Sequence, residues 1–222
     1  MHDAITIAES ALGYRGRTVL RDVKMTIAPG ERVAILGRSG AGKSTLLNYI
    51  YGCCRPDAAL VPQAASLVGA LSVFHNVFMG QLERHSTLFN LRTLLCPGTR
   101  EKEDIGRILD LLGLREKMFD PAGSLSGGQQ QRTSIARAIY NARPIIVGDE
   151  PVSALDRLQG ESLLCCLKER ARTLVLAMHD VPLALAHSTR IVMLHAGRVA
   201  LDVPSSGVRA ADLAMYYDAG AR

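Results

Sequence analysis

The order of apolar and polar positions divides the chain into strands and helices that alternate. Period-two or continuous apolar runs predict strands, and apolar residues recurring every three or four positions predict helices. The predicted strands are 4–8, 19–27, 32–36, 145–149, 173–178 and 190–195. The predicted helices are 43–51, 127–142, 157–171, 181–187 and a short final helix, with a helical pattern over 72–112 that is interrupted near Pro97 and Gly98.

This alternation predicts an α/β fold, with a mostly parallel core sheet that carries helices on its faces. The helical stretch from about 66 to 142 is too long for a single crossover between two strands. We therefore expect it to be a helical subdomain inserted into the sheet. The expected organisation is one domain over 1–222, whose core comprises 1–65 and 143–222.

Composition narrows the class of protein. A chain of 222 residues with 48% hydrophobic content can bury a core, and 21% charged residues argue against disorder. No apolar run approaches the about 18 residues of a membrane helix, and His2 and Asp3 do not fit a secretory signal. The five cysteines lack CxxC spacing and are odd in number, which indicates a reduced cytosolic protein. The net charge of +5 suits an anionic ligand or an anionic membrane surface but is more typical of a mildly basic protein without either.

Residues 37–45, GRSGAGKST, form a complete phosphate-binding loop between a predicted strand and a predicted helix. Glycines let the backbone approach an anion, and the helix start presents free N–H groups to it. Lys43 adds a charge for the β- and γ-phosphates, and the Ser44 hydroxyl can ligate Mg²⁺. The residues that we expect to bind nucleotide here are Gly37, Arg38, Ser39, Gly40, Ala41, Gly42, Lys43, Ser44 and Thr45.

Residues 145–150, IIVGDE, are an apolar run that ends in two acids. A buried strand of this kind places Asp149 at the carboxyl edge of the sheet, where ligands bind in open α/β sheets. We expect Asp149 to hold Mg²⁺ and Glu150 to polarise the water that attacks the γ-phosphate. A strand that merely ends in surface acids would look the same, but the phosphate loop upstream favours the functional interpretation.

Residues 125–132, LSGGQQQR, predict a second anion-binding helix start. Ser126 is a good N-cap, and Gln129 three residues later completes a capping box. Gly127 and Gly128 leave N–H groups free at the start of a helix, with no lysine beside them. Two anion sites in one chain make sense if the second serves another chain.

Together these strings resemble the ATP-binding-cassette (ABC) ATPases, in which LSGGQQQR matches the signature motif. The resemblance covers essentially the whole chain, with the motifs in the family's order. It implies a P-loop NTPase that binds and hydrolyses ATP with Mg²⁺. It also implies a head-to-tail dimer with a second copy of the chain, in which Ser126, Gly127, Gly128 and Gln129 close the site of the other subunit.

The resemblance assigns further residues one by one. Gln63 matches the glutamine that senses Mg²⁺ and the attacking water and contacts the transporter partner. His179 matches the histidine that contacts the γ-phosphate, and Tyr14 matches the aromatic residue that stacks on adenine. The segment that matches the link between the two active sites is Ser153, Ala154, Leu155 and Asp156.

The segments 71–80, LSVFHNVFMG, and AADLAMYY near the C-terminus are similar to bacterial phosphonate-type importer ATPases. One departure from the family is the short stretch of about twenty residues between Lys43 and Gln63. Ten residues that must also leave a helix cannot form a hairpin. We therefore expect a shortened antiparallel subdomain made of 4–8 and 19–27 with at most one strand before Gln63, and an open adenine side near Tyr14.

The resemblance implies an ATP-hydrolysing subunit that powers import of a small solute, such as a phosphonate. The expected partners are transmembrane permease subunits and a solute-binding protein, with no nucleic acid, and the expected location is the cytoplasmic face of the cell membrane. The alternatives are an exporter or lipoprotein-release ATPase and a soluble non-transport ABC ATPase. A nucleotide-binding protein without hydrolysis is disfavoured by the presence of Asp149, Glu150 and His179.

Overall fold

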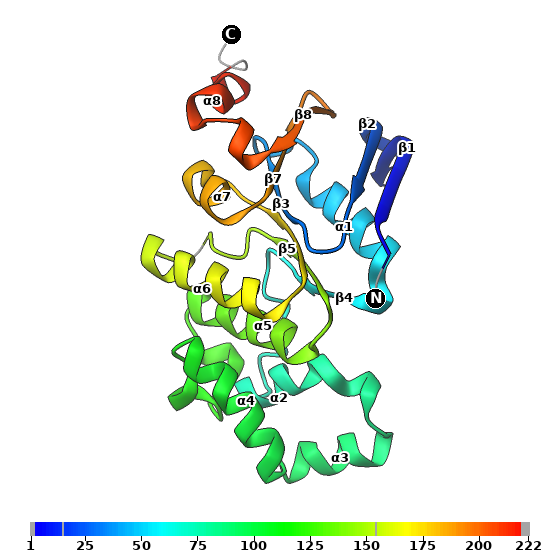
Figure 1. Cartoon of the computed structure of the whole chain (residues 1–222). Coiled ribbons are helices and arrows are strands. Elements are labelled where there is room, and N and C mark those ends of the chain that lie inside the picture. The colour runs from blue at the N-terminus through cyan, green and yellow to red at the C-terminus, as the bar shows by residue number, and fades with distance from the viewer. Residues whose placement is uncertain (1–2, 15, 154, 219–222) are drawn as a thin grey trace.

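A six-stranded sheet forms the centre of the protein in the computed structural model, which describes residues 3–14, 16–153 and 155–218 (Figure 1). The strand order is β4-β5-β6-β3-β7-β8, and every neighbouring pair is parallel except the antiparallel pair β7 and β8. The strands are β3 (Arg32–Leu36), β4 (Ala58–Val61), β5 (Ile145–Asp149), β6 (Thr173–Ala177), β7 (Arg190–His195) and β8 (Arg198–Pro204).

Successive residues of the inner strands point into two separate hydrophobic clusters. In β3, Val33 and Ile35 belong to one cluster, while Ala34 and Leu36 belong to the other. The first cluster is covered by α1 (Lys43–Cys54) and the second by α5 (Gly127–Asn141), α6 (Arg157–Arg170) and α7 (Val181–His187). Burial on both faces explains why these strands are continuous apolar runs in the sequence.

The first two strands form a separate antiparallel hairpin that lies over α1 (Figure 1). Strand β1 (Ile5–Tyr14) pairs with β2 (Arg17–Ile27), and alternate residues such as Ile7 and Leu20 are buried. Strand β1 continues to Tyr14, beyond the predicted end at residue 8. The hairpin is the entire small antiparallel sheet among the described residues.

The segment between α1 and Gln63 contains a 3₁₀ turn (Arg55–Asp57) and one strand, β4. No second strand fits there, as the sequence predicted. The strand nevertheless belongs to the main parallel sheet, where it pairs with β5, and not to the antiparallel hairpin. Its sequence, AALV, explains the difference, because an unbroken apolar run suits a strand that is buried on both faces.

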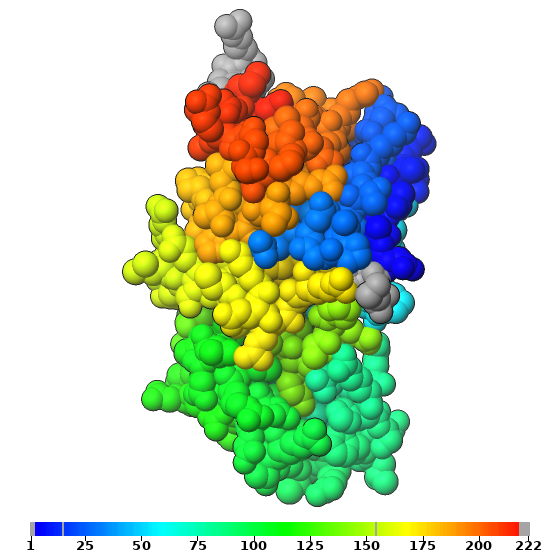
Figure 2. All heavy atoms as spheres, viewed as in Figure 1, coloured from blue at the N-terminus to red at the C-terminus, as the bar shows by residue number. Residues whose placement is uncertain are grey.

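The helical pattern over 72–112 is divided into several short elements: α2 (Val73–Phe78), a 3₁₀ helix (Met79–Arg84), α3 (Thr87–Leu95) and α4 (Thr99–Leu111). Ser72 and Ser86 each accept a hydrogen bond from the backbone three residues on, so they start new helices inside the predicted pattern. The predicted break near Pro97 and Gly98 is present. This region forms the lower end of the molecule (Figure 2).

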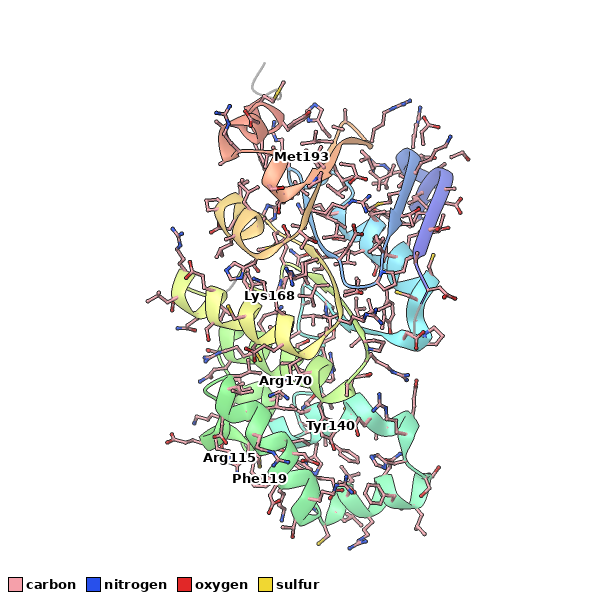
Figure 3. All side chains as sticks on the ribbon, viewed as in Figure 1. Arg115, Phe119, Tyr140, Lys168, Arg170 and Met193 are labelled. Atoms are coloured by element: carbon pink, nitrogen blue, oxygen red, sulfur yellow. The ribbon has the colours of Figure 1, made fainter. Side chains whose placement is uncertain are left out.

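Aromatic side chains pack against one another in this helical region. Phe74 lies 5.9 Å from Phe119 and Phe78 lies 6.4 Å from Tyr140, measured between ring centroids. Phe119 and Tyr140 are labelled in Figure 3. Because Tyr140 belongs to α5, this cluster joins the helical region to the helix that covers the sheet.

The remaining elements complete the sheet and its cover. Strand β8 was not predicted, although RVALDVP alternates half-buried and exposed residues in the structure, as an edge strand does. The last helix is α8 (Ala210–Asp218), and further 3₁₀ turns are Arg115–Lys117, Ala122–Ser124 and Ser205–Gly207. None of the helices over 3–14, 16–153 and 155–218 combines the length and the apolar character needed to span a membrane.

Candidate nucleotide-binding site

The phosphate loop connects β3, which ends at Leu36, to α1, which begins at Lys43. Two of its glycines have positive φ angles and lie against other parts of the protein. A Cβ atom on Gly37 (φ 151°) would lie 2.7 Å from the Leu194 carbonyl oxygen, and one on Gly42 (φ 102°) would lie 2.7 Å from Leu20 Cδ2. Only glycine fits such positions without displacement, so sheet and hairpin together fix the loop.

The start of α1 has no side-chain cap; its N-cap is Gly42. The first N–H groups of a helix have no partner inside the helix, and the macrodipole makes that end positive. In α1 these groups are therefore available to an anion, which is the arrangement that a phosphate requires.

Lys43 lies buried at this helix start, with 5% of its surface exposed. Its Nζ donates to the Gly37 carbonyl at 2.9 Å and to the Arg38 carbonyl at 3.3 Å, and lies 3.9 Å from Glu150 Oε1. Burial lowers the pKa of Lys43, and the charges of Glu150 and Asp149 oppose that shift. The two carboxylates thus help to keep the lysine charged where a phosphate would bind.

The two acids that follow β5 have different surroundings. Asp149 is the last residue of the strand and is 9% exposed, and its Oδ1 has no hydrogen-bond partner within the described residues. Glu150 has a φ of +52°, a left-handed conformation that costs a non-glycine residue roughly 1–2 kcal/mol. In this conformation the Glu150 side chain reaches Lys43, Gln63 and His179. Strained backbone of this kind is found mainly at functional sites.

Glu150 brings together three other predicted residues. His179 Nε2 lies 2.5 Å from Glu150 Oε1, and Gln63 Nε2 donates to Glu150 Oε2 at 3.4 Å. Lys43 approaches the same carboxylate from the loop. Each comes from just before or after a different strand or helix: Gln63 after β4, Glu150 after β5, His179 after β6 and Lys43 at the start of α1.

A cavity of about 530 Å³ connects these residues to the hairpin. Ligand pockets are typically about 300–1,000 Å³. It is lined by Tyr14, Arg17, Thr18, Val19, Ser39, Gly40, Gly42, Lys43, Ser44, Thr45, Gln63 and Glu150. Gly37, Arg38 and Ala41 belong to the same loop but do not line the cavity, and neither do Asp149 and His179.

Sequence reasoning missed Arg17, Thr18 and Val19 at this cavity. The β1–β2 register pairs Tyr14 with Arg17 and Gly13 with Thr18, so these residues return beside the predicted adenine-stacking residue. A prediction of the strand pairing, and not only of the two strands, would have placed these residues beside Tyr14.

Tyr14 stands between two open spaces. It is 62% exposed and lines both the main cavity and a second one of about 440 Å³. The second cavity lies between the hairpin and α1, with Leu12, Asn48 and Tyr49 in its wall. No third strand of the described chain joins the hairpin beside Tyr14.

The LSGGQQQR segment begins α5, and the predicted capping box is confirmed. Gln129 N donates to Ser126 Oγ at 3.4 Å, and Ser126 N donates to Gln129 Oε1 at 2.9 Å. Gly127 and Gly128 are the first two residues of the helix. None of these four residues lines the cavity of its own chain, so their role at another subunit's site stays a prediction.

The segment after Glu150 closes its turn and starts the next helix. Ser153 Oγ donates to the Glu150 carbonyl at 3.0 Å, and Asp156 Oδ1 accepts from Gln159 N at 2.9 Å as the N-cap of α6. Leu155 packs against the core. The predicted member Ala154 lies outside the described residues.

The chain is similar to known proteins in sequence and in fold. Residues 20–153 match the family model described as ABC transporter. The chain is 37% identical to a phosphonates import ATP-binding protein of Pseudomonas entomophila, over 92% of this chain and 88% of that protein. It is 35% identical to that of Pseudomonas putida, over 92% and 86%. A dimeric, post-hydrolysis structure of an ATP-binding cassette with bound ADP and phosphate matches with a TM-score of 0.74 and 26% identity, over 91% of this chain and 98% of that structure.

Proposed function

We propose, from the membership of this chain in the ABC transporter family and its nature as an ATPase of that family, a role in import. In this role the chain hydrolyses MgATP to drive import of a phosphonate-like solute. The observation that carries the chemistry is the convergence of Lys43, Gln63 and His179 on Glu150 beside the phosphate loop. Phosphoryl transfer needs positioning and charge neutralisation more than covalent chemistry, and these residues supply both.

Ser44 and Asp149 carry oxygen atoms that fit a magnesium ion beside the phosphate loop. Asp149 presents a buried oxygen without a partner in the described chain, and the Ser44 hydroxyl lines the cavity at the helix start. Hydroxyl and carboxylate oxygens are ligands that Mg²⁺ accepts. We assign Ser44 and Asp149 as its ligands, with Gln63 beside them, and its chemistry as neutralisation of phosphate charge.

Glu150 is the proposed general base. Its carboxylate is held by His179 and Gln63, so that an attacking water at Glu150 would find a fixed acceptor for its proton. Lys43 and the free N–H groups of α1 hold the phosphates. Tyr14 receives the adenine at the outer end of the cavity.

The signature segment is proposed to complete the site of a second copy. The start of α5 lies away from the cavity of its own chain, yet Gly127 and Gly128 give it the features of an anion site. A head-to-tail dimer would use it. The solved cassette of similar fold with ADP and phosphate is dimeric, which supports this arrangement.

The assignment to import rests on the relatives from the two Pseudomonas species, whose names state phosphonates import. Permease subunits in the membrane and a solute-binding protein are the proposed partners, and the proposed location is the cytoplasmic membrane face. An exporter or lipoprotein-release role remains the second candidate from the sequence, but these relatives favour import.

The dimer is tested by diluting the purified chain and measuring ATPase activity per molecule. If each site needs two chains, specific activity falls on dilution below the dimer dissociation constant, while ATP binding persists. Specific activity that stays constant over the whole dilution range would contradict a composite site.

The substrate is tested in vesicles that contain this chain, its permease and its binding protein. Phosphonate should stimulate ATP hydrolysis and accumulate on the side of the vesicle where the ATPase lies, whereas an unrelated sugar should do neither. Stimulation with movement in the opposite direction would establish export instead.

A further inference from the structure

Arg137 lies in the second half of α5, between helix residues that are buried, such as Ile135, Ala136 and Ile139. Burial lowers its pKa, which means that its charge is held in an unfavourable environment. No ion pair joins it to a carboxylate anywhere in residues 3–14, 16–153 or 155–218. Arg137 is half-buried, and a partly buried charge without an ionic partner costs more than a fully solvated one.

The hydrogen bonds of the guanidinium show what it does instead. Nη1 donates to the Ser66 carbonyl at 3.1 Å, and Nη2 donates to the Ala65 carbonyl at 3.2 Å. The planar fork of arginine suits two neighbouring acceptors, whereas a lysine ammonium is a single point. Arg137 therefore clamps the main chain of two consecutive residues.

These two residues follow Gln63 in the irregular segment between β4 and α2. Ser66 has a φ of +47°, which is strained for a residue other than glycine. The second half of the segment is held by Asn76, whose side chain bonds Val68 and the Leu71 carbonyl. Among the side-chain hydrogen bonds of the described residues that reach other elements, the first half has the Arg137 clamp and the bond from Gln63 to Glu150.

We propose that Arg137 is a positioning residue for ATP hydrolysis, which holds Gln63 against Glu150 by clamping Ala65 and Ser66 and links Gln63 to the signature helix. The inference rests on the proposed function. Ser126 is the N-cap of α5, the helix that carries Arg137. Arg137 lies about ten residues further on, which is roughly 15 Å along the helix axis. Any displacement of the signature end therefore moves the clamp and with it the segment that begins at Gln63.

The first test is Arg137→Lys in the full-length chain. Lysine keeps the charge, but its one nitrogen cannot occupy the positions of both guanidinium nitrogens or reproduce their planar fork, so both carbonyl bonds should weaken and Gln63 should lose its fixed position. We expect kcat to fall about tenfold, within the roughly hundredfold that a 1 Å misplacement can cause. KM for ATP should stay within about twofold, because the phosphate loop is untouched.

Arg84→Lys is the matched control. Arg84, in the 3₁₀ helix Met79–Arg84, also donates to a main-chain carbonyl at α5, that of Ala142 at 3.4 Å. This carbonyl is at the C-terminal end of α5, and no hydrogen bond of the described residues joins Arg84 to the segment that follows Gln63. Its kcat should equal that of the unmodified chain. An equal loss in both variants would overturn the proposal.

A double-mutant cycle separates positioning from a general structural role. In a Gln63→Ala background, Arg137→Lys should cause no further fall in kcat, because the residue that it positions is already gone. Two losses that multiply would overturn the role of Arg137 while leaving the proposed function intact. If the unmodified chain has no ATPase activity, the proposed function fails first.

Thermal unfolding of each variant controls for folding. If Arg137→Lys does not fold, Arg137→Gln, which is shorter and neutral, replaces it in the same cycle. Failure of both variants to fold would show that Arg137 is needed for the structure as a whole, and would also overturn the proposal.

Discussion

The two ends of the nucleotide cavity are built differently. At the phosphate end, Lys43, Glu150 and His179 follow buried elements of the central sheet and contact one another. At the other end, Tyr14 ends one strand of a two-stranded hairpin, is 62% exposed and has open space on both sides. The same ligand would thus meet a fixed end and a loosely supported end.

The anchoring of the hairpin sharpens this contrast. Arg190 Nη1 donates to the Thr26 carbonyl at 2.6 Å and also pairs with Glu31, far along β2 from Tyr14. Nearer Tyr14, the hydroxyl of Tyr49 on α1 donates to Glu9 at 2.5 Å. Since the phosphate end is fixed by many buried contacts, we expect substitutions there to have large effects and substitutions at the hairpin end to have small ones.

Glu150→Gln should have the largest effect. The amide keeps the shape of the side chain but cannot accept a proton from water, and a general base contributes about 10²–10⁴-fold to rate. We expect kcat to fall by that factor while ATP still binds, so that ATP accumulates a stable dimer that light scattering detects. Near-normal turnover would show that Glu150 is not the base.

Lys43→Ala should have the next largest effect, on binding. A charge-assisted contact to a phosphate contributes roughly 1.5–3 kcal/mol, so the affinity for ATP should fall about ten- to a hundredfold. Calorimetry with ATP measures the change directly. Unchanged affinity would mean that phosphates do not bind at the loop.

The fixed end was also the end that the sequence predicted best. Phosphate loops and apolar runs that end in acids are local strings, and their strand–loop–helix context follows from hydrophobic periodicity. The structure brings Lys43 and Glu150 of these strings together with Gln63 and His179, which the family resemblance had assigned. The capping box at Ser126 was predictable for the same reason, because it depends only on residues three positions apart.

Features that depend on distant contacts were missed or misplaced. Strand β4 joins the main sheet because of its partner β5, which lies more than eighty residues later in the sequence. Arg137 looks like one more charged residue in a helix until its contacts to Ala65 and Ser66 are seen.

Tyr14→Ala tests the loosely supported end. Stacking on an aromatic side chain contributes about 1–3 kcal/mol per base, and the exposure of Tyr14 favours the lower value. We expect ATP affinity to fall roughly fivefold, with Tyr14→Phe close to the unmodified chain because the ring remains. A loss as large as that of Lys43→Ala would break the contrast between the two ends.

The smallest expected effect is on the pH dependence of folding stability, through His187 at the end of α7. Burial, and then the charge of Lys168 on α6 (Figure 3), lower the pKa of His187 below 6.5, while Glu161 opposes the shift. Arg32 lines the same small space, and Nδ1 of His187 has no partner in the described chain. Below pH 6.5 the unfolded chain therefore binds a proton that the folded chain resists, so this contribution to stability is complete above that pH and is lost as the pH falls through the lowered value.

Urea unfolding at about pH 7.5 and about pH 5.5 should show a decrease in midpoint that is smaller in His187→Gln. Tyr14→Phe, which alters only the hairpin end, should keep the full decrease; an identical decrease in His187→Gln would show that His187 does not contribute to it.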